Sequence, residues 1–428
     1  MATVVRRSGE EVTVEVTVRL SGSLLEMEAA ILEASNAVGR CATEEALQRF
    51  DTDGRAIRVG EIKLTARGRD PKEYQTPYGA VEVERYVYQS SRGGRIYCPL
   101  EHQARIVRGA TPRFASQLSH KDAQLNARAV QADLEQNHGR TVAASYIQNV
   151  AEWVGDIATA KEADWEYAMP ALERPIATVV VSLDGAMIPM ADAAGYREAM
   201  VGTLSFYDHA GERQHSIYLA AAPEYGKQAF LQRLEREIVR AKQHFPAALY
   251  LGIADGAASN WRFLERHTDR QLIDFFHATE YVGKVAQATY PYRQAEGQRA
   301  QWQQEYCTKL KHDPDALDVL IGEAARLSQR HRLSPKVRDG AISAWTYFTN
   351  HRHQMDYPGF LAAGLPIGSG VTEAACKTLV KQRLCASGMR WKTQGAGIVL
   401  SLRALTHTAG RWAQFWRKID QFGAECCG

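Results

Sequence analysis

The sequence predicts a mixed α/β protein in which a small β module and a helical region precede the main domain. Three observations indicate this fold class. Short alternating runs broken by glycine fill residues 56–98, helical periodicity replaces them over 111–155, and a succession of strand-like apolar runs begins at Ile176. The length of 428 residues exceeds one ordinary domain, and 45% hydrophobic with 24% charged residues is typical of a globular protein.

The N-terminal region is expected to combine strands with one long helix. Residues 10–20, EEVTVEVTVRL, alternate like a half-buried strand, and residues 23–50 carry apolar side chains at helical spacing. The β runs that follow include SRGGR, which is typical of a hairpin turn. We therefore assign residues 1–110 to a helix plus a β module, whose residue types indicate no function.

Residues 111–165 are predicted to form a helix-turn-helix-like DNA-binding region. One helix should end near Asn137, Gly139 suits a left-handed corner, and Thr141 can cap the next helix. In such a motif the second helix enters the major groove. The side chains predicted to face the groove are Ser145, Gln148 and Asn149. Helix pairs of this kind also occur in ordinary helical packing, and these helices carry few basic residues, so both interpretations stand.

The main domain should begin with three strands, a helix, a buried strand and a further helix. The strands are IATVVVSLDGAMIP, REAMVGTLSFYD, RQHSIYLAAAP and, after a helix over 225–244, ALYLGIAD. A fifth strand begins at RQLID. This order is that of a ribonuclease H-like mixed sheet, in which the first and fourth strands are neighbours.

The boundaries of this domain follow from the pattern that interrupts it. Residues 170–290 and 365–428 are assigned to the ribonuclease H-like core, with a helix from the basic C-terminal segment packed on the sheet. Residues 291–364 lie between these two parts and carry helical periodicity. They are too many for a loop, so we interpret them as an all-helical insertion.

Three acidic residues lie where such a sheet would gather its functional side chains. Asp184 in VVVSLDGAMIPM and Asp255 in LYLGIADGAASNW each end a β run, and Glu373 opens a helix after the turn Gly368-Ser369-Gly370, in which Ser369 can cap the helix. Adjacent aspartates repel unless they share a proton or a cation, and carboxylate oxygens are the ligands that Mg²⁺ prefers. We predict that the three acids hold two Mg²⁺ ions, for which Mn²⁺ can substitute. As an alternative, Asp-Gly at both aspartates also fits a simple turn, and an acid in a first helical turn also fits the helix dipole.

The segment after Glu373 is strongly basic. From Lys377 to Lys418 it carries nine lysines and arginines and no acidic residue, a pattern suited to a polyanion. The alternative is a solvated helical face, which usually interleaves acids. The residues predicted to contact DNA are Lys377, Lys381, Arg383, Arg390, Trp391 and Lys392. Trp391 could stack on an unpaired base at a cleaved DNA end, or it could be a core tryptophan.

Several of these motifs together resemble one family. IGSGVTEAACKTLVKQRL and SGMRW, with the two strand-ending aspartates and the helical insertion, closely resemble DDE transposases of the ISKra-type insertion-sequence family, which are relatives of the mutator-like group. The resemblance covers most of the chain and is most specific over 181–189, 250–261 and 366–392. It implies Mg²⁺-dependent cleavage of double-stranded DNA at element ends, followed by attack of the freed 3′-hydroxyl on target DNA.

The resemblance also extends to a histidine. Mutator-like enzymes carry a Cys- or Asp-x-x-His element after the second aspartate, and Asp274-Phe275-Phe276-His277 fits it. His277 is therefore a further candidate catalytic residue, which could hydrogen-bond a phosphate or an active-site carboxylate. A buried structural histidine at a strand end is the alternative.

Two other functions fit the same residues. One is a ribonuclease H-like nuclease or resolvase without strand transfer, and the other is a non-enzymatic DNA-binding protein descended from a transposase. A transposase must hold two DNA ends together, so we expect a homodimer or a larger assembly. Seven cysteines without zinc spacing, and the lack of a long apolar run or secretory signal, predict a cytoplasmic, nucleoid-associated protein outside the membrane.

Overall fold

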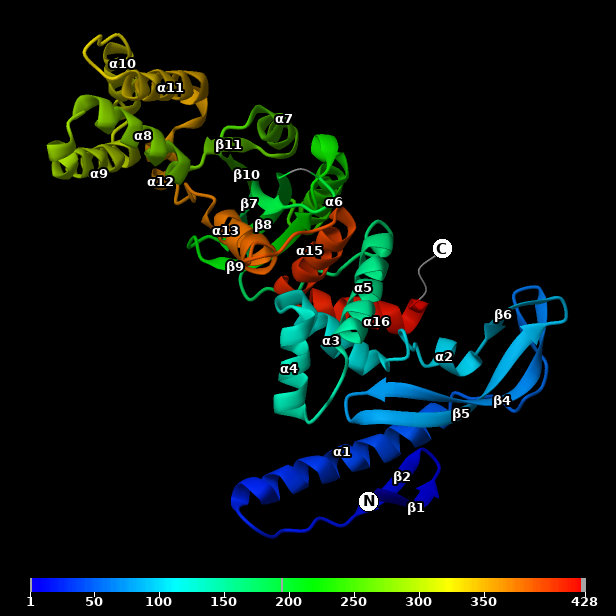
Figure 1. The fold of residues 1–428 in the computed structure, drawn as a ribbon. Coiled ribbons are helices and arrows are strands. Elements are labelled where there is room, and N and C mark those ends of the chain that lie inside the picture. The colour runs from blue at the N-terminus through cyan, green and yellow to red at the C-terminus, as the bar shows by residue number, and fades with distance from the viewer. Residues whose placement is uncertain (1, 194, 425–428) are drawn as a thin grey trace. The chain divides into compact units, whose positions relative to one another are not determined.

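The computed structural model describes residues 2–193 and 195–424 and shows a mixed α/β protein, which confirms the predicted class (Figure 1). The chain forms two compact units. The first consists of Met1–Ala168, Gln394–Thr406 and Gly410–Gly428, and the second of Met169–Thr393 and His407–Ala409. No helix within the described ranges is both long and apolar enough to cross a membrane. The five cysteines of the described residues are free thiols, whereas Cys426 and Cys427 lie outside those residues.

The first unit begins with a hairpin and a long helix. β1 (Ala2–Ser8) pairs with β2 (Glu11–Val16), and α1 (Leu24–Gln48) follows. The Ser23 side chain accepts a hydrogen bond from the Glu26 N–H at 3.3 Å, and the Glu26 carboxylate accepts one from the Ser23 N–H at 2.6 Å. This capping box begins α1 at its predicted position. The strand β1 was not predicted.

A four-stranded antiparallel sheet and a short helix complete the β module. Its elements are β3 (Ile57–Val59), β4 (Ile62–Thr76), β5 (Gly79–Ser90), β6 (Gly93–Tyr97) and α2 (Pro99–Gln103). Glu101 of α2 accepts hydrogen bonds from Lys72 Nζ at 2.6 Å and from the Tyr74 hydroxyl at 2.9 Å. Arg85 lies 3.6 Å from Glu101. Burial alone would raise the pKa of Glu101, but these donors lower it overall.

Helices make up the rest of the first unit. They are α3 (Pro112–Gln124), α4 (Ala127–His138), α5 (Ala144–Lys161), α15 (Thr393–His407) and α16 (Arg411–Phe422). Gly139 ends α4 at φ 60°, as predicted for the corner, but α5 is preceded by Ala143, so Thr141 is not its cap. Leu402 and Phe415 share one core with Leu118 and its neighbours on α3 and α5. The range 365–428, expected to belong to a single core, is therefore divided between the two units.

The second unit contains a five-stranded mixed sheet. Its strands are β7 (Ile176–Pro189), β8 (Tyr196–Asp208), β9 (Arg213–Ala221), β10 (Leu249–Ala254) and β11 (Arg270–Ile273). They lie in the order β11-β10-β7-β8-β9, with β7, β10 and β11 parallel and β8 antiparallel to both of its neighbours. The first and fourth strands of the unit are neighbours, as predicted.

Helices cover both faces of this sheet. On one face Phe230 and Leu234 of α6 (Gln228–His244) pack in one core with Leu204 and Phe206 of β8. Alternation along β8 turns Thr203 to the other face, where its hydroxyl bonds that of Thr372 at 2.7 Å. That face carries a continuous helical stretch composed of α13 (Gly370–Ala375), a π-helical segment (Cys376–Lys381) and α14 (Gln382–Leu384). α7 (Ala258–His267) connects β10 to β11.

The stretch between β11 and α13 is helical. Its helices are α8 (Phe275–Thr289), α9 (Glu296–His312), α10 (Ala316–Ser328), α11 (Pro335–His351) and α12 (Tyr357–Ala362) (Figure 1). α11 begins at Pro335 after Ser334, and proline is common at this first helical position. The two ends of the stretch meet, because the Phe275 N–H donates to the Ile367 carbonyl at 3.0 Å.

Candidate functional site

Asp184 and Asp255 come together where β7 and β10 stop pairing. The parallel ladder between these strands ends at Ser182 and Ile253. Asp255 directly follows β10, as predicted, whereas Asp184 lies inside β7 rather than at its end, because the antiparallel ladder with β8 continues to Pro189. Burial, together with the negative charge of Asp255, raises the pKa of Asp184. The structure thus brings the two predicted aspartates close enough to interact.

Glu373 joins this pair from the first turn of α13. Burial raises the pKa of Glu373, and the negative charges of Asp274 and Asp184 raise it further, while His277 lowers it. These directions place Glu373 near Asp184 and near the Asp-x-x-His segment. Asp184 thus interacts with both of the other predicted ligands, Asp255 and Glu373.

Asp274 connects the start of α8 to the turn before α13. One carboxylate oxygen accepts from the Phe276 N–H at 2.6 Å and caps α8, and the other accepts from the Ser369 N–H at 2.6 Å and from its hydroxyl. Ser369 was expected to cap α13, but its hydroxyl is used on Asp274 instead. Asp274 is fully buried. It therefore fixes the turn that presents Glu373.

His277 lies one helical turn beyond Asp274. Ligand atoms of Asp274, His277 and Glu373 all lie within 4.8 Å of one another. The Nδ1 atom of His277 is buried and has no hydrogen-bond partner among the described residues. The predicted catalytic histidine is thus placed beside Glu373 with a nitrogen free to bind. Asp274 was quoted in the motif but was not predicted as a site residue.

Cys376 is a site residue that the sequence did not indicate. Its thiol lies 3.6 Å from the free oxygen of Asp184, whose other oxygen accepts from the Gly185 N–H at 2.7 Å. Burial raises the pKa of Cys376, and the charge of Asp184 raises it further, so the thiol stays protonated and can donate to the carboxylate. The π-helical segment begins at this residue, and such segments are frequent at functional sites.

The helical insertion supports the loop of Asp255. The Tyr347 hydroxyl on α11 donates to the Asp255 carbonyl at 3.0 Å, and the Tyr347 ring stacks on Tyr281 with centroids 3.7 Å apart. Gly256 has φ +110°, and a Cβ there would lie 3.2 Å from both Tyr347 and His351. The close approach needs glycine at this position. Tyr347 was not predicted, because nothing in local periodicity links residue 347 to residue 255.

The residues predicted to contact DNA near the site fall into two groups. Arg383 is only 6% exposed, and its guanidinium lies over the Trp391 ring at 5.3 Å. Trp391 is half-buried, donates its indole N–H to the Leu384 carbonyl at 2.9 Å and is bonded to β7 through its backbone. Both are thus engaged in packing, which matches the core alternative for Trp391 and corrects the prediction for Arg383. The exposed members are Lys377, Lys381, Arg390 and Lys392.

The first unit holds the other predicted DNA contacts. Ser145, Gln148 and Asn149 are exposed on α5, and Gln148 donates to Glu152 at 2.7 Å. Arg403 and Arg411, which belong to the acid-free stretch, are buried in this unit. That stretch consequently does not form one continuous exposed basic face, because Arg403 and Arg411 pack inward.

No protein-family model and no curated protein matches this sequence.

The donor set fits a hard divalent cation. The negative charge of Asp255 raises the pKa of Asp184, and those of Asp274 and Asp184 raise the pKa of Glu373, so like charges repel at this site. A bound cation would relieve this repulsion. Carboxylate oxygens suit Mg²⁺ and Mn²⁺, and the free nitrogen of His277 suits Mn²⁺ better than Mg²⁺.

Proposed function

We propose that this chain is a DNA transposase of an insertion sequence, which cleaves element ends and joins the freed 3′-hydroxyl to target DNA. The observation that carries the proposal is that Asp184 interacts with Asp255 and also with Glu373. The strand order in which the first and fourth strands are neighbours supports a ribonuclease H-like core as part of the same proposal. The resemblance of residues 366–392 to ISKra-type enzymes supports strand transfer in particular.

The proposed chemistry is metal-dependent phosphoryl transfer. Asp184, Asp255 and Glu373 would hold two Mg²⁺ ions, as in two-metal phosphoryl transfer, and Mn²⁺ would substitute. When bound, the metal supplies Lewis-acid stabilisation of the phosphodiester oxygens and activation of the attacking hydroxyl. The Cys376 thiol and the Gly185 N–H orient the Asp184 carboxylate. Asp274 holds the Glu373 turn, and the Nδ1 atom of His277 is available for a hydrogen bond to a phosphate.

Double-stranded DNA is the proposed partner, in the form of element ends and target. Exposed Lys377, Lys381, Arg390 and Lys392 are the proposed phosphate contacts near the site, and the exposed face of α5 is a second proposed contact. Two ends must be held together, so the proposed working form is a homodimer or larger. The proposed location is the cytoplasm, on the nucleoid.

The test is cleavage and joining with purified protein. The substrates are duplexes that carry the inverted repeats flanking the gene, with Mg²⁺ and a supercoiled target plasmid. The wild type should cleave and join, and Asp184→Asn should lower both by at least about 1,000-fold, since a ligand of the reacting metal is lost. Asp184→Asn should still bind DNA with a steep salt dependence, because the phosphate contacts are unchanged.

The same assay separates the rival functions. Cleaved ends without joined products would indicate a nuclease or resolvase. Binding without cleavage by the wild type would indicate a DNA-binding protein that lacks catalysis. Cleavage by Asp184→Asn at the wild-type rate would remove the carboxylate site from the proposal.

A further inference from the structure

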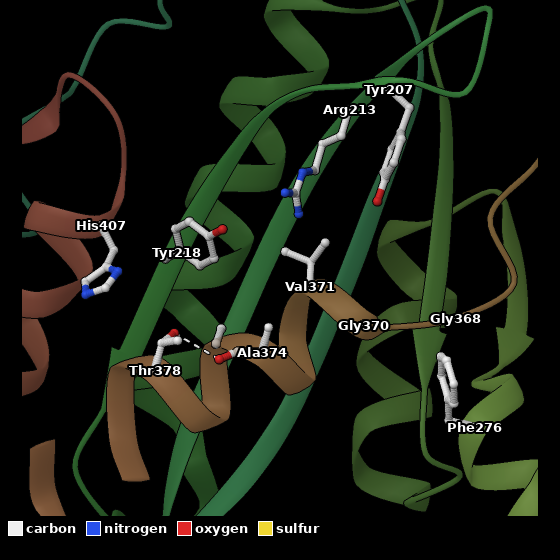
Figure 2. A pocket seen from close by; sticks show the side chains of 11 residues that line it. Tyr207, Arg213, Tyr218, Phe276, Gly368, Gly370, Val371, Ala374, Thr378 and His407 are labelled. Atoms are coloured by element: carbon white, nitrogen blue, oxygen red, sulfur yellow. Dashed lines mark hydrogen bonds between the residues drawn. The ribbon is translucent and has the colours of Figure 1, made fainter. Parts of the chain in front are cut away.

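A hollow lies in the second unit on the side of α13 that faces β9. Its volume is about 610 Å³, and it is bounded by the edge of the sheet, by α13 and the π-helical segment, and by the turn before α13. Figure 2 shows Arg213, Tyr207 and Tyr218 projecting from the strands toward Val371 and Thr378 of the helix. None of these residues belongs to the carboxylate site.

The two faces of β8 and β9 differ sharply in chemistry. The face toward α6 carries Leu204, Phe206 and Ile217 in the core. The face toward α13 carries hydroxyl and aromatic groups, because Thr203 bonds Thr372 and Ser205 lies 3.2 Å from Ser216. Tyr207 and Tyr218 continue this face into the hollow. The sheet edge thus presents polar aromatic rings where an ordinary core would place aliphatic side chains.

One positive charge belongs to the hollow. Arg213 is exposed and pairs with Tyr207 across the two strands. Burial raises the pKa of Tyr207, while the nearby guanidinium of Arg213 opposes this shift. A guanidinium beside two tyrosine rings can bind an anion and stack on a planar group.

The mouth of the hollow lies at the turn that also presents Glu373. A Cβ added at Gly370 would meet no atom within 4 Å, and one added at Gly368 would meet only the Phe276 ring, at 3.3 Å. Phe276 itself is 58% exposed at this mouth. Glu373 follows Gly370 by three residues and faces the carboxylate side of the same helix. A strand passing over this turn would reach both sides.

We propose that this hollow binds one unpaired nucleotide of a DNA strand whose neighbouring phosphate lies at the carboxylate site. Tyr207 or Tyr218 would stack on the base, and Arg213 would bind the phosphate on the other side of that nucleotide, away from the carboxylate site. The volume falls in the range of small-ligand sites and accommodates a single nucleotide. The inference rests on the proposed function and deepens it, because it names the DNA strand end that the site recognises.

The test measures single-stranded DNA binding by the full-length protein without metal. The probe is a fluorescein-labelled oligothymidylate of about 12 nucleotides, followed by anisotropy, because one stacked base contributes enough to be resolved. Tyr218→Ala and Arg213→Gln should each weaken binding about tenfold. Matched controls are Tyr292→Ala and Arg293→Gln, two exposed residues of the insertion, which should change binding less than about twofold. If Tyr218→Ala and Arg213→Gln bind the oligonucleotide as tightly as the two control variants do, the inference is overturned.

Photocrosslinking locates the base directly and does not depend on a variant that folds. An oligonucleotide with 5-iodouracil, crosslinked to the wild type and digested, should yield adducts on Tyr207, Tyr218 or Phe276. Adducts found only elsewhere overturn the inference.

Failure of this inference can be told apart from failure of the proposed function. If the wild type cleaves DNA but Tyr218→Ala leaves single-strand binding unchanged, the nucleotide site in the hollow is overturned and the transposase proposal stands. Tyr218-dependent binding by a wild type that never cleaves would support the hollow and overturn the transposase proposal.

Discussion

Two sites in this protein contain partly buried carboxylates, and their surroundings shift the carboxyl pKa values in opposite directions. In the β module of the first unit, Glu101 lies among Lys72, Tyr74 and Arg85, and the pKa of its carboxyl is lowered. In the second unit, burial and neighbouring acids raise the pKa values of Asp184 and Glu373. The first group is neutralised by the chain itself and serves stability. The second retains a repulsion that an external cation can relieve, which is the property of a binding site.

The largest expected effect comes from removing the negative charge of Glu101. Glu101→Gln should lower the free energy of unfolding by about 3 kcal/mol at pH 7.5, because Lys72 and the buried Tyr74 hydroxyl both lose a charged hydrogen-bond acceptor. The pKa of Glu101 is lowered in the folded protein, so its contribution is present above the ordinary glutamate value and is lost as the pH falls through the folded value. Urea unfolding of both proteins across this range measures the difference. A loss that persists at low pH would contradict the ionic origin.

The second prediction adds a cation to the second group. Mg²⁺ at about 100 times its dissociation constant should stabilise the wild type by about 2.7 kcal/mol, and Asp184→Asn should lose most of this gain. Thermal unfolding with Mg²⁺ and with chelator provides the readout. Glu101→Gln is the matched control and should keep the full response to Mg²⁺. A wild type indifferent to Mg²⁺ would contradict the cation site.

The third prediction concerns the repulsion between Asp184 and the neighbouring acids, which a substitution removes without any added cation. Without metal at pH 7.5, Asp184→Asn should be more stable than the wild type by about 1 kcal/mol, because a buried charge among like charges is replaced by a neutral group of similar shape. The sign is opposite to that of Glu101→Gln. Urea unfolding in chelator tests it, and destabilisation of both variants would erase the contrast between the two groups.

The smallest effect concerns the support of Asp255 from the insertion. Tyr347→Phe removes one neutral hydrogen bond, worth about 1 kcal/mol, while keeping the stack on Tyr281. DNA cleavage should slow by about fivefold with unchanged DNA binding, since the loop of Asp255 is held less firmly. Tyr292→Phe, exposed on the same insertion, is the control. An unaltered rate would show that the stack alone fixes the loop.

The sequence predicts the strand order and the elements on which Asp184, Asp255 and Glu373 lie. These features follow from alternation, turn residues and the chain order of strands and helices. Alternation and turn residues define β7 to β11, and the chain order of strands and helices implies that β7 and β10 are neighbours. The sequence does not predict that Ser369 binds Asp274 or that Tyr347 reaches Asp255, because these contacts join residues far apart in the chain. Periodicity likewise shows that α15 has an apolar face without showing which core it enters, so the sequence does not reveal that Arg403 of the acid-free stretch is buried.

The meeting of the two ends of the insertion makes this segment modular. The chain leaves the sheet at Phe275 and returns at Ile367, where their backbones are hydrogen-bonded, and Asp274 holds Ser369 beside them. The entropy of closing a loop grows only with the logarithm of its length, so the distal helices α9 and α10 can be lengthened or shortened at little cost to the sheet, provided that α11 keeps Tyr347 on the loop of Asp255. The protein thus has an insertion site at which another helical segment could be placed while β10, β11 and α13 keep their positions.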